Sequence, residues 1–156
     1  MTRIPDEADR DFTAGCLIID DGKLLLIKHS KLDMWLQPGG HVEERETPDE
    51  TALRETREET GFVVEILEQF RPEKEEIGGS YNLPTPFCMN AHQIRDGHWH
   101  CSMLYIAKVI DKREATHIHE KKDMRWFSKE DLEDSRYDIP ENIRDAGRNA
   151  LDIKNG

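Results

Sequence analysis

Three glutamates with helical spacing are the residues in this chain whose types and positions indicate chemistry. Glu55, Glu58 and Glu59 are spaced i, i+3, i+4, which places their carboxylates side by side on one arc of a helix. Such carboxylates repel one another by roughly a few tenths of a kcal/mol per pair, and by more where water is excluded. A divalent cation reverses the sign, because hard cations such as Mg²⁺ bind carboxylate oxygens. For the helix taken alone, a solvated acidic face with a favourable Glu50–Arg54 pair is the other interpretation.

The ends of that helix are marked in the sequence. Thr47 is a suitable N-cap, Pro48 occupies the first helical position, and Glu50 follows the cap by three residues. Gly61 can adopt the left-handed conformation that ends a helix. The pattern predicts about four turns, roughly 20 Å at ~1.5 Å per residue. The stripe predicted to face the core comprises Ala52, Leu53, Thr56 and Thr60.

The segment before the helix adds two glycines, Gly39 and Gly40, which let backbone approach a ligand closely. From Gly40 to Phe62 the chain reads GHVEERETPDETALRETREETGF. This string resembles the Nudix box, G-x5-E-x7-R-E-U-x-E-E-x-G-U, where U is bulky and aliphatic. Every fixed charged or glycine position is filled. Thr56 and Phe62 depart from the usual aliphatic residues, but both occupy packing positions.

The resemblance implies a fold and an activity. The expected fold is a mixed α+β architecture of the α/β class, a Nudix-type α/β/α sandwich with a mixed, curved sheet. The expected reaction is metal-dependent hydrolysis of a diphosphate bond in a nucleoside diphosphate linked to another group, by attack of water on phosphorus. Mg²⁺ or Mn²⁺ would be the cofactor, because the cleft and its substrate are both anionic.

The resemblance also assigns roles by position in the box. The implied metal ligands are three side chains and one backbone carbonyl: Glu55, Glu58, Glu59 and Gly40. Arg54 is expected to orient the carboxylates through ion pairs, with Glu46 as its partner. The general base is open between a box glutamate and one on a distal loop, for which Glu120 is the candidate. The expected catalytic residues are therefore Arg54, Glu55, Glu58, Glu59 and Glu120.

Residues outside the box bear on substrate and on other metals. The expected substrate contacts are aromatic or polar residues near the cleft: Tyr81, Phe87, Trp99 and His100. Oxidised nucleotides, dinucleoside polyphosphates, nucleotide sugars and capped RNA ends all remain open as substrates. The pairs His98/His100 and His117/His119 could form a transition-metal site, or serve as polar strand residues or hydrogen-bonding groups in the cleft.

Two other classes of function compete with hydrolysis. A Nudix-like domain could bind nucleotides as a sensor, although such domains often lose box carboxylates and this chain has them all. Isopentenyl diphosphate isomerase shares the domain but uses a cysteine in a motif ahead of the box. The cysteine available there, Cys16, lies in a hydrophobic run without that motif.

Composition narrows the class further. The chain has 156 residues and a net charge of −11, which fits a single domain and argues against duplex nucleic acid or anionic membranes as partners. No apolar run approaches the ~20 residues of a membrane span, and the polar first ten residues do not resemble a signal peptide. Three unpatterned cysteines, Cys16, Cys88 and Cys101, fit a reducing cytoplasm better than a disulfide framework. We expect a flexible tail over residues 1–10, one domain over 11–156, and a monomer or homodimer acting on a small nucleotide.

The remaining elements follow from alternation and turn signals. Hairpins are predicted where Asp-Gly pairs separate apolar runs, and the four strands are Phe12–Ile19 with Lys23–Ile27, and Phe87–Ile94 with His98–Val109. Phe62–Phe70 and Met124–Phe127 are further expected strands, and Arg71–Pro86 is expected to lack regular structure. Ser128 should cap a helix, and a last helix should follow Pro140, with an apolar stripe of Ile143, Gly147, Ala150 and Leu151.

Overall fold

The computed structural model describes residues 1–68, 73–112 and 123–155. Its centre is a mixed sheet in the order β10-β2-β1-β9-β5, with β3 paired to β2, β4 to β1 and β8 to β9. The strands are β1 Asp9–Asp20, β2 Lys23–His29, β3 Met34–Leu36, β4 Gly39–His41, β5 Val63–Ile66, β8 Cys88–Arg95, β9 His98–Asp111 and β10 Met124–Phe127. The long β1–β9 pair is parallel, whereas the other pairs are antiparallel. The sheet is therefore mixed, as the resemblance implied.

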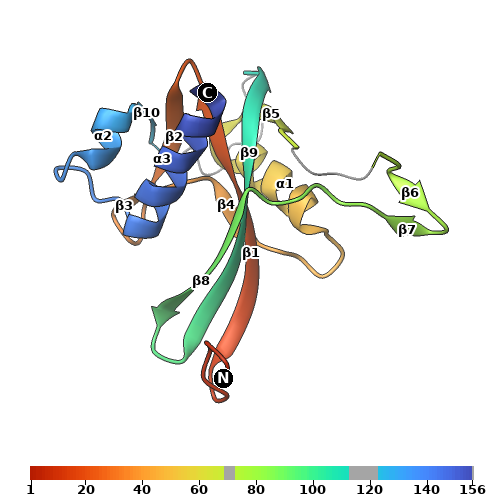
Figure 1. Ribbon diagram of the computed structural model, residues 1–156. Helices are drawn as coiled ribbons and strands as arrows, with labels where there is room; N and C mark the ends of the chain where they lie inside the picture. The colour runs from red at the N-terminus through yellow and green to blue at the C-terminus, as the bar shows by residue number, and fades with distance from the viewer. Residues whose placement is uncertain (69–72, 113–122, 156) are drawn as a thin grey trace.

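Helices cover both faces of this sheet (Figure 1). Helix α1, Pro48–Thr60, packs on one face, and α3, Glu141–Asn155, packs on the other beside the short α2, Lys129–Glu133. The sheet has a hydrophobic core on each face, and alternate residues of β1 pack into each: Cys16 packs on the α1 side and Leu17 on the α3 side. The expected α/β/α sandwich is confirmed. None of the helices in the described ranges is long and apolar enough to cross a membrane.

Helix α1 begins and ends where its sequence signals predict. Thr47 is the N-cap, and its N–H donates to Glu50 Oε2 at 2.8 Å. At the other end Gly61 has φ of 79°, and its N–H donates to the Arg57 carbonyl at 2.9 Å. The predicted stripe is buried at Ala52, Thr56 and Thr60 and half-buried at Leu53.

The two predicted hairpins are present. Asp21 and Gly22 both have positive φ, as a two-residue turn between β1 and β2 requires.

In β9, Tyr105 and Ala107 pack on the α1 side, while Leu104 and Ile106 pack on the α3 side, so the strand is buried on both faces.

Segment 71–86 differs from its prediction where the structure describes it. It contains a small hairpin of β6, Glu76–Ile77, and β7, Ser80–Tyr81, which projects from the body of the sheet (Figure 1). Gly78 and Gly79 both have positive φ, as a tight turn between β6 and β7 requires. The charged residues before them had not suggested strands. At the N-terminus, β1 begins at Asp9, so the last two residues of the expected tail are strand.

The C-terminal elements match their predictions. Strand β10 covers the predicted Met124–Phe127, and Ser128 caps α2 by accepting a hydrogen bond from the Asp131 N–H at 3.1 Å. In α3 the predicted stripe faces the core: Ile143 is 4% exposed, and Leu151 is fully buried. A side chain at Gly147 would collide with Leu24, so this glycine permits close approach of α3 to the sheet.

Candidate active site

The glycines before α1 are held against β1 at very short range. Strand β4 pairs with β1 so that Gly39 lies opposite Gly15 and Gly40 opposite Ala14. A Cβ on Gly39 would lie 2.6 Å from the Ala14 carbonyl oxygen and 2.9 Å from Gly15 Cα. The Gly39 N–H in turn donates to Glu59 Oε1 at 2.9 Å. The glycine segment is thus fixed between the sheet and a carboxylate of α1.

Gly40 lies directly against a second box carboxylate. A Cβ placed on Gly40 would collide with Oε1 and Cδ of Glu55. Because only glycine leaves room here, the backbone at position 40 and the carboxylate of Glu55 share one small space. The carboxylates of Glu55 and Glu59 thus lie against the glycine segment and offer hard oxygen donors there.

Arg54 links acidic residues of the box. Its Nε and Nη2 donate to the two carboxylate oxygens of Glu46, at 2.5 and 3.0 Å. Its Nη1 donates to Glu55 Oε1 at 3.1 Å and to Glu58 Oε2 at 3.2 Å. Thr51 adds a hydrogen bond from its hydroxyl to Glu46 Oε2 at 2.7 Å. One guanidinium therefore sets the positions of three carboxylates.

These contacts shift the proton affinities of the groups involved. Hydrogen bonds from Arg54, and then from Thr51, lower the pKa of Glu46 from its ordinary 4.5 to about 2. The hydrogen bond to Glu46 raises the pKa of Arg54. Burial raises the pKa of Glu55, against the attraction of Arg54, and the nearby Glu59 and Glu58 add to the rise. Glu55 thus lies in a site that disfavours one more uncompensated negative charge.

Replacing Arg54 should release Glu46 from this ion pair. In Arg54→Gln we expect the pKa of Glu46, followed by NMR titration of its carboxyl carbon, to return toward 4.5 from about 2. Because the folded-state pKa is depressed, the pair stabilises the native state above pH 4.5 and loses that contribution as the pH falls toward 2. The unfolding free energies of wild type and variant should therefore converge across that range. An unchanged Glu46 titration in the variant would contradict the assignment.

The box carboxylates fit a hard divalent cation by their chemistry. Glu59 is 7% exposed, and its oxygen accepts from the Gly39 N–H. Glu55 and Glu58 both accept hydrogen bonds from Arg54 Nη1, so one positive group lies between these two carboxylates. Glu55 lies against Gly40, whose missing side chain leaves room for the carboxylate, and all three glutamates offer oxygen donors. Such a donor set suits Mg²⁺ or Mn²⁺ better than a metal that prefers nitrogen or sulfur.

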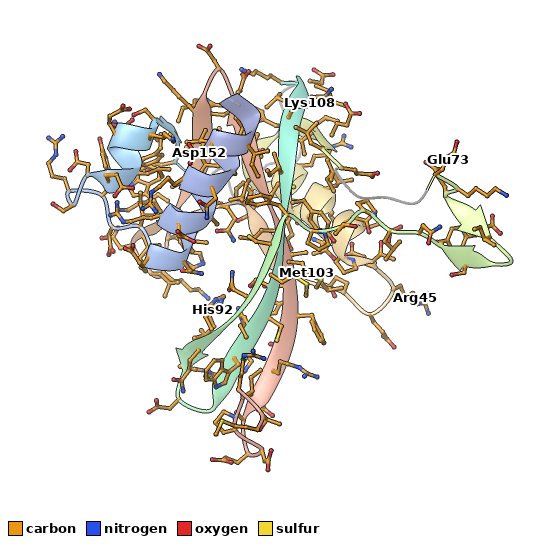
Figure 2. The ribbon with its side chains drawn as sticks, in the orientation of Figure 1. Arg45, Glu73, His92, Met103, Lys108 and Asp152 are labelled. Carbon is orange, nitrogen blue, oxygen red and sulfur yellow. The ribbon has the colours of Figure 1, made fainter. Side chains whose placement is uncertain are left out.

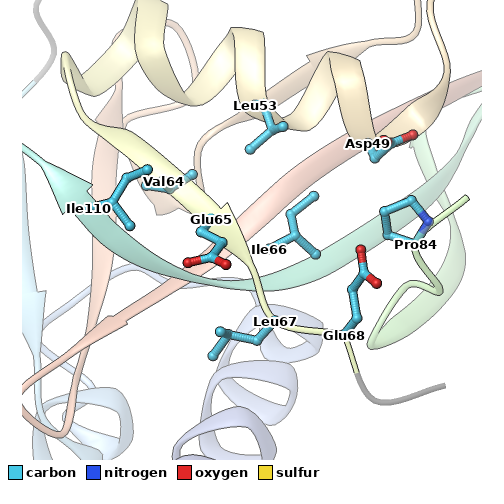
Figure 3. Close-up of a pocket in the computed structure, with 9 residues that line it drawn as sticks. All are labelled: Asp49, Leu53, Val64, Glu65, Ile66, Leu67, Glu68, Pro84 and Ile110. Carbon is cyan, nitrogen blue, oxygen red and sulfur yellow. The ribbon is translucent and has the colours of Figure 1, made fainter. Parts of the chain in front are cut away.

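A separate pocket of about 630 Å³ lies along the other side of α1 (Figure 3). At ~100° per residue, Leu53 in its wall is about 160° around the helix from Glu55. The pocket has an apolar floor and acidic edges, and its lining residues are Asp49, Leu53, Val64, Glu65, Ile66, Leu67, Glu68, Pro84 and Ile110. Among the described residues, this lining has three carboxylates and no cation, which disfavours an anionic diphosphate there.

The four substrate contacts predicted from the sequence do not converge on one place. Tyr81 is 70% exposed on the projecting β6–β7 hairpin. Phe87 packs against the core on the α3 side of the sheet. Trp99 and His100 are neighbours in β9 and therefore lie on opposite faces. Trp99 Nε1 is buried and lacks a hydrogen-bond partner within the described ranges.

Some predicted residues lie outside the described ranges, and some residues with polar contacts were missed. Glu120, His117 and His119 fall in the segment 113–122, outside the described residues. Sequence reasoning missed Thr51 of α1, whose hydroxyl donates to Glu46 in the loop before the helix. A buried threonine one turn from the box arginine was the available signal, but its partner depends on how the loop before α1 folds back.

The fold and the site together define an α/β/α domain in which a glycine-led acidic helix is fixed to a mixed sheet. A model of the NUDIX domain matches residues 9–147 of the sequence. The chain therefore belongs to the Nudix family. A crystal structure of a NUDIX-family hydrolase from Clostridium perfringens superposes with a TM-score of 0.81 at 31% identity, covering 94% of this chain and 99% of that one.

Curated relatives match about a third of the chain. A Lactococcus lactis subsp. cremoris protein named "Probable DHNTP pyrophosphohydrolase" is 44% identical over 59 residues, which is 38% of this chain and 36% of that protein. The mouse asymmetrical bis(5'-nucleosyl)-tetraphosphatase is 49% identical over 53 residues, which is 32% of this chain and 36% of that protein. The chain thus matches about a third of the length of each relative, so the similarity to these named proteins concerns only the matched segment.

Proposed function

We propose that this protein is a metal-dependent pyrophosphohydrolase that cleaves a diphosphate bond in a nucleoside diphosphate linked to another group. The observation that carries the proposal is that Glu55 and Glu59 lie against the glycine segment, while Arg54 joins Glu55 to Glu58 on the same helix. Family membership supports the reaction class. Two relatives with pyrophosphohydrolase or tetraphosphatase names support a diphosphate bond as the target.

The roles follow from the chemistry of each group. Glu55, Glu58 and Glu59, with the Gly40 carbonyl, would hold Mg²⁺ or Mn²⁺, which when bound screens the charge of the diphosphate and activates water. Arg54 orients the carboxylates of Glu46, Glu55 and Glu58 through its hydrogen bonds to them. Glu120 remains the distal candidate for the general base. The substrate contacts expected from the sequence, Tyr81, Phe87, Trp99 and His100, lie at separate places in the fold and stay individual predictions.

The proposed function is tested by a hydrolysis screen with Mg²⁺ across nucleoside diphosphate derivatives, with products identified by mass. We expect cleavage within the diphosphate and incorporation of ¹⁸O from labelled water into a phosphate product. Binding of nucleotides by calorimetry without any product would instead support a sensor. Conversion of isopentenyl diphosphate to its isomer would support the third class of function.

Gly40→Ala should disable the site while leaving most of the fold unchanged. The new Cβ would occupy the space of the Glu55 carboxylate, so the carboxylate must turn away from the backbone. Misplacing a group in a metal site costs roughly 10- to 100-fold in metal affinity or activity, and we expect a loss of that size in kcat/KM. Gly97→Ala, at a turn with open space around it but positive φ, controls for the cost of replacing a glycine. Equal activity of Gly40→Ala and wild type would contradict the proposed geometry.

A further inference from the structure

Four histidines and one aspartate gather on the arm formed by β1, β8 and β9. The arm extends beyond the helices that cover the rest of the sheet (Figure 1), and His92 marks it in Figure 2. Asp11 lies opposite His100 in the β1–β9 register, and His92 lies opposite His100 in the β8–β9 register. His41 of β4 and His98 of β9 complete the group.

The side chains of this group lie within contact distance of one another. Asp11 Oδ2 lies 3.4 Å from His41 Nε2 and 3.2 Å from His98 Nε2. The ring of His100 has its centroid 5.1 Å from that of His41 and 5.2 Å from that of His98. Within the described ranges, Asp11, His41 and His100 form the group whose potential metal-binding atoms all lie within 4.8 Å of one another.

We propose that Asp11, His41 and His100 form a binding site for a divalent transition-metal ion of the zinc class. Two imidazole nitrogens and one carboxylate oxygen are ligands that Zn²⁺ accepts, with a fourth position left for water. Metal–ligand bonds of ~2.0–2.2 Å place donor atoms roughly 3.3 Å apart in a tetrahedral site. The Asp11–His41 pair already has this separation at 3.4 Å, and the exposed ring of His41 can turn to bring the other donor atoms closer.

The neighbouring groups support the ligands. His98 Nε2 lies 3.2 Å from Asp11 Oδ2 and helps to position this carboxylate. His92 is held by Asn90, whose Oδ1 lies 2.8 Å from His92 Nδ1. The hydroxyls of Thr13 and Ser102 are 2.6 Å apart in the next row of the sheet. A polar patch therefore surrounds the three ligands on a strand face that elsewhere carries apolar core residues.

This site is distinct from the glutamates of the box. Side chains alternate between the two faces along β1, and Asp11 is six residues before Leu17, so both lie on the α3 face. The box glutamates belong to α1, which packs on the other face. Consecutive residues of β4 face opposite sides of the sheet: Gly40 pairs with Ala14, whereas His41 pairs with Thr13. Nitrogen donors on one face and oxygen donors on the other should select different ions.

The test uses Co²⁺ as a coloured substitute for Zn²⁺, titrated into the whole protein with Mg²⁺ held at saturation. We expect wild type to bind Co²⁺ with a visible d–d absorption band that Zn²⁺ abolishes. His100→Gln and Asp11→Asn should each weaken Co²⁺ binding by at least ~10-fold, since even groups outside the ligand set cost that much. Zn²⁺ should also raise the Tm of wild type, because it binds the folded arm, and that rise should be lost in both variants.

Two controls separate this site from other histidines and from the proposed catalytic site. His29→Gln removes a histidine of β2, outside the cluster, and should bind Co²⁺ as wild type does. Glu58→Gln should also retain the band, whether or not the chain hydrolyses diphosphates. The inference is overturned if His100→Gln and Asp11→Asn bind Co²⁺ with wild-type affinity, or if Glu58→Gln alone abolishes binding. Matched unfolding curves in EDTA will show that both cluster variants fold.

Discussion

Glu58→Gln is expected to lower Mg²⁺-dependent hydrolysis by roughly 100- to 1000-fold, which corresponds to about 3–4 kcal/mol of transition-state stabilisation. Glu58 is one of the three proposed metal ligands, and the amide of glutamine carries no charge to hold the ion. Its side chain is 59% exposed and bonded to Arg54, so the fold should tolerate the change. Initial rates measured across a Mg²⁺ titration will give both kcat and the apparent affinity for the ion.

The matched control for this variant is Glu44→Gln, in the exposed loop before the helix. It removes the same charge from the same acidic chain without touching Arg54 or the glycine segment. We expect its rate to remain close to that of wild type. A Glu58→Gln protein with full Mg²⁺-dependent activity would refute the role of this carboxylate.

Phe127→Ala should destabilise the native state strongly. Phe127 is fully buried at the end of β10, where its ring packs edge-on against Trp35 and Tyr137 at centroid distances of 5.3 and 5.1 Å. Truncation leaves a cavity between the sheet and the α2–α3 layer, and such changes cost about 3–5 kcal/mol. Because domains of this kind are stable by only about 5–15 kcal/mol, urea unfolding should show a large drop in midpoint at an unchanged slope.

A second phenylalanine provides the comparison. Phe12 is 48% exposed on β1, with Arg10 over its ring, and Phe12→Ala should cost below about 1 kcal/mol. If both variants lost equal stability, the core around Phe127 would not have the packing described. A change in slope for Phe127→Ala would show instead that the unfolded state or the cooperativity had changed.

Local patterns in the sequence predicted much of the site. The limits of α1 follow from Thr47, Pro48 and Gly61, because caps and breakers act within a few residues of the chain. The hairpin at Asp21–Gly22 follows for the same reason. The box string placed Arg54 among its glutamates, since residues three and four apart on a helix are neighbours whatever surrounds them.

Other features depended on packing between distant segments. The hairpin in 71–86 was not predicted, because a charge run hid strands of only two residues each. Trp99 and His100 were grouped as substrate contacts, but strand alternation sends them to opposite faces. The hydroxyl of Thr51 adds a second hydrogen bond to Glu46 Oε2, which Arg54 also contacts, and this partnership depends on how the loop before α1 folds back.

The sequence by itself determined the helix, its acidic arc and the membership that the box implies, since all of these arise within one short stretch of chain. The tertiary structure alone decided that Asp11, His41 and His100 meet. These residues come from three strands, and their contact depends on the parallel register of β1 with β9 and on the antiparallel register of β4 with β1. Register is set by burial of the apolar faces across the whole sheet, which no local spacing encodes.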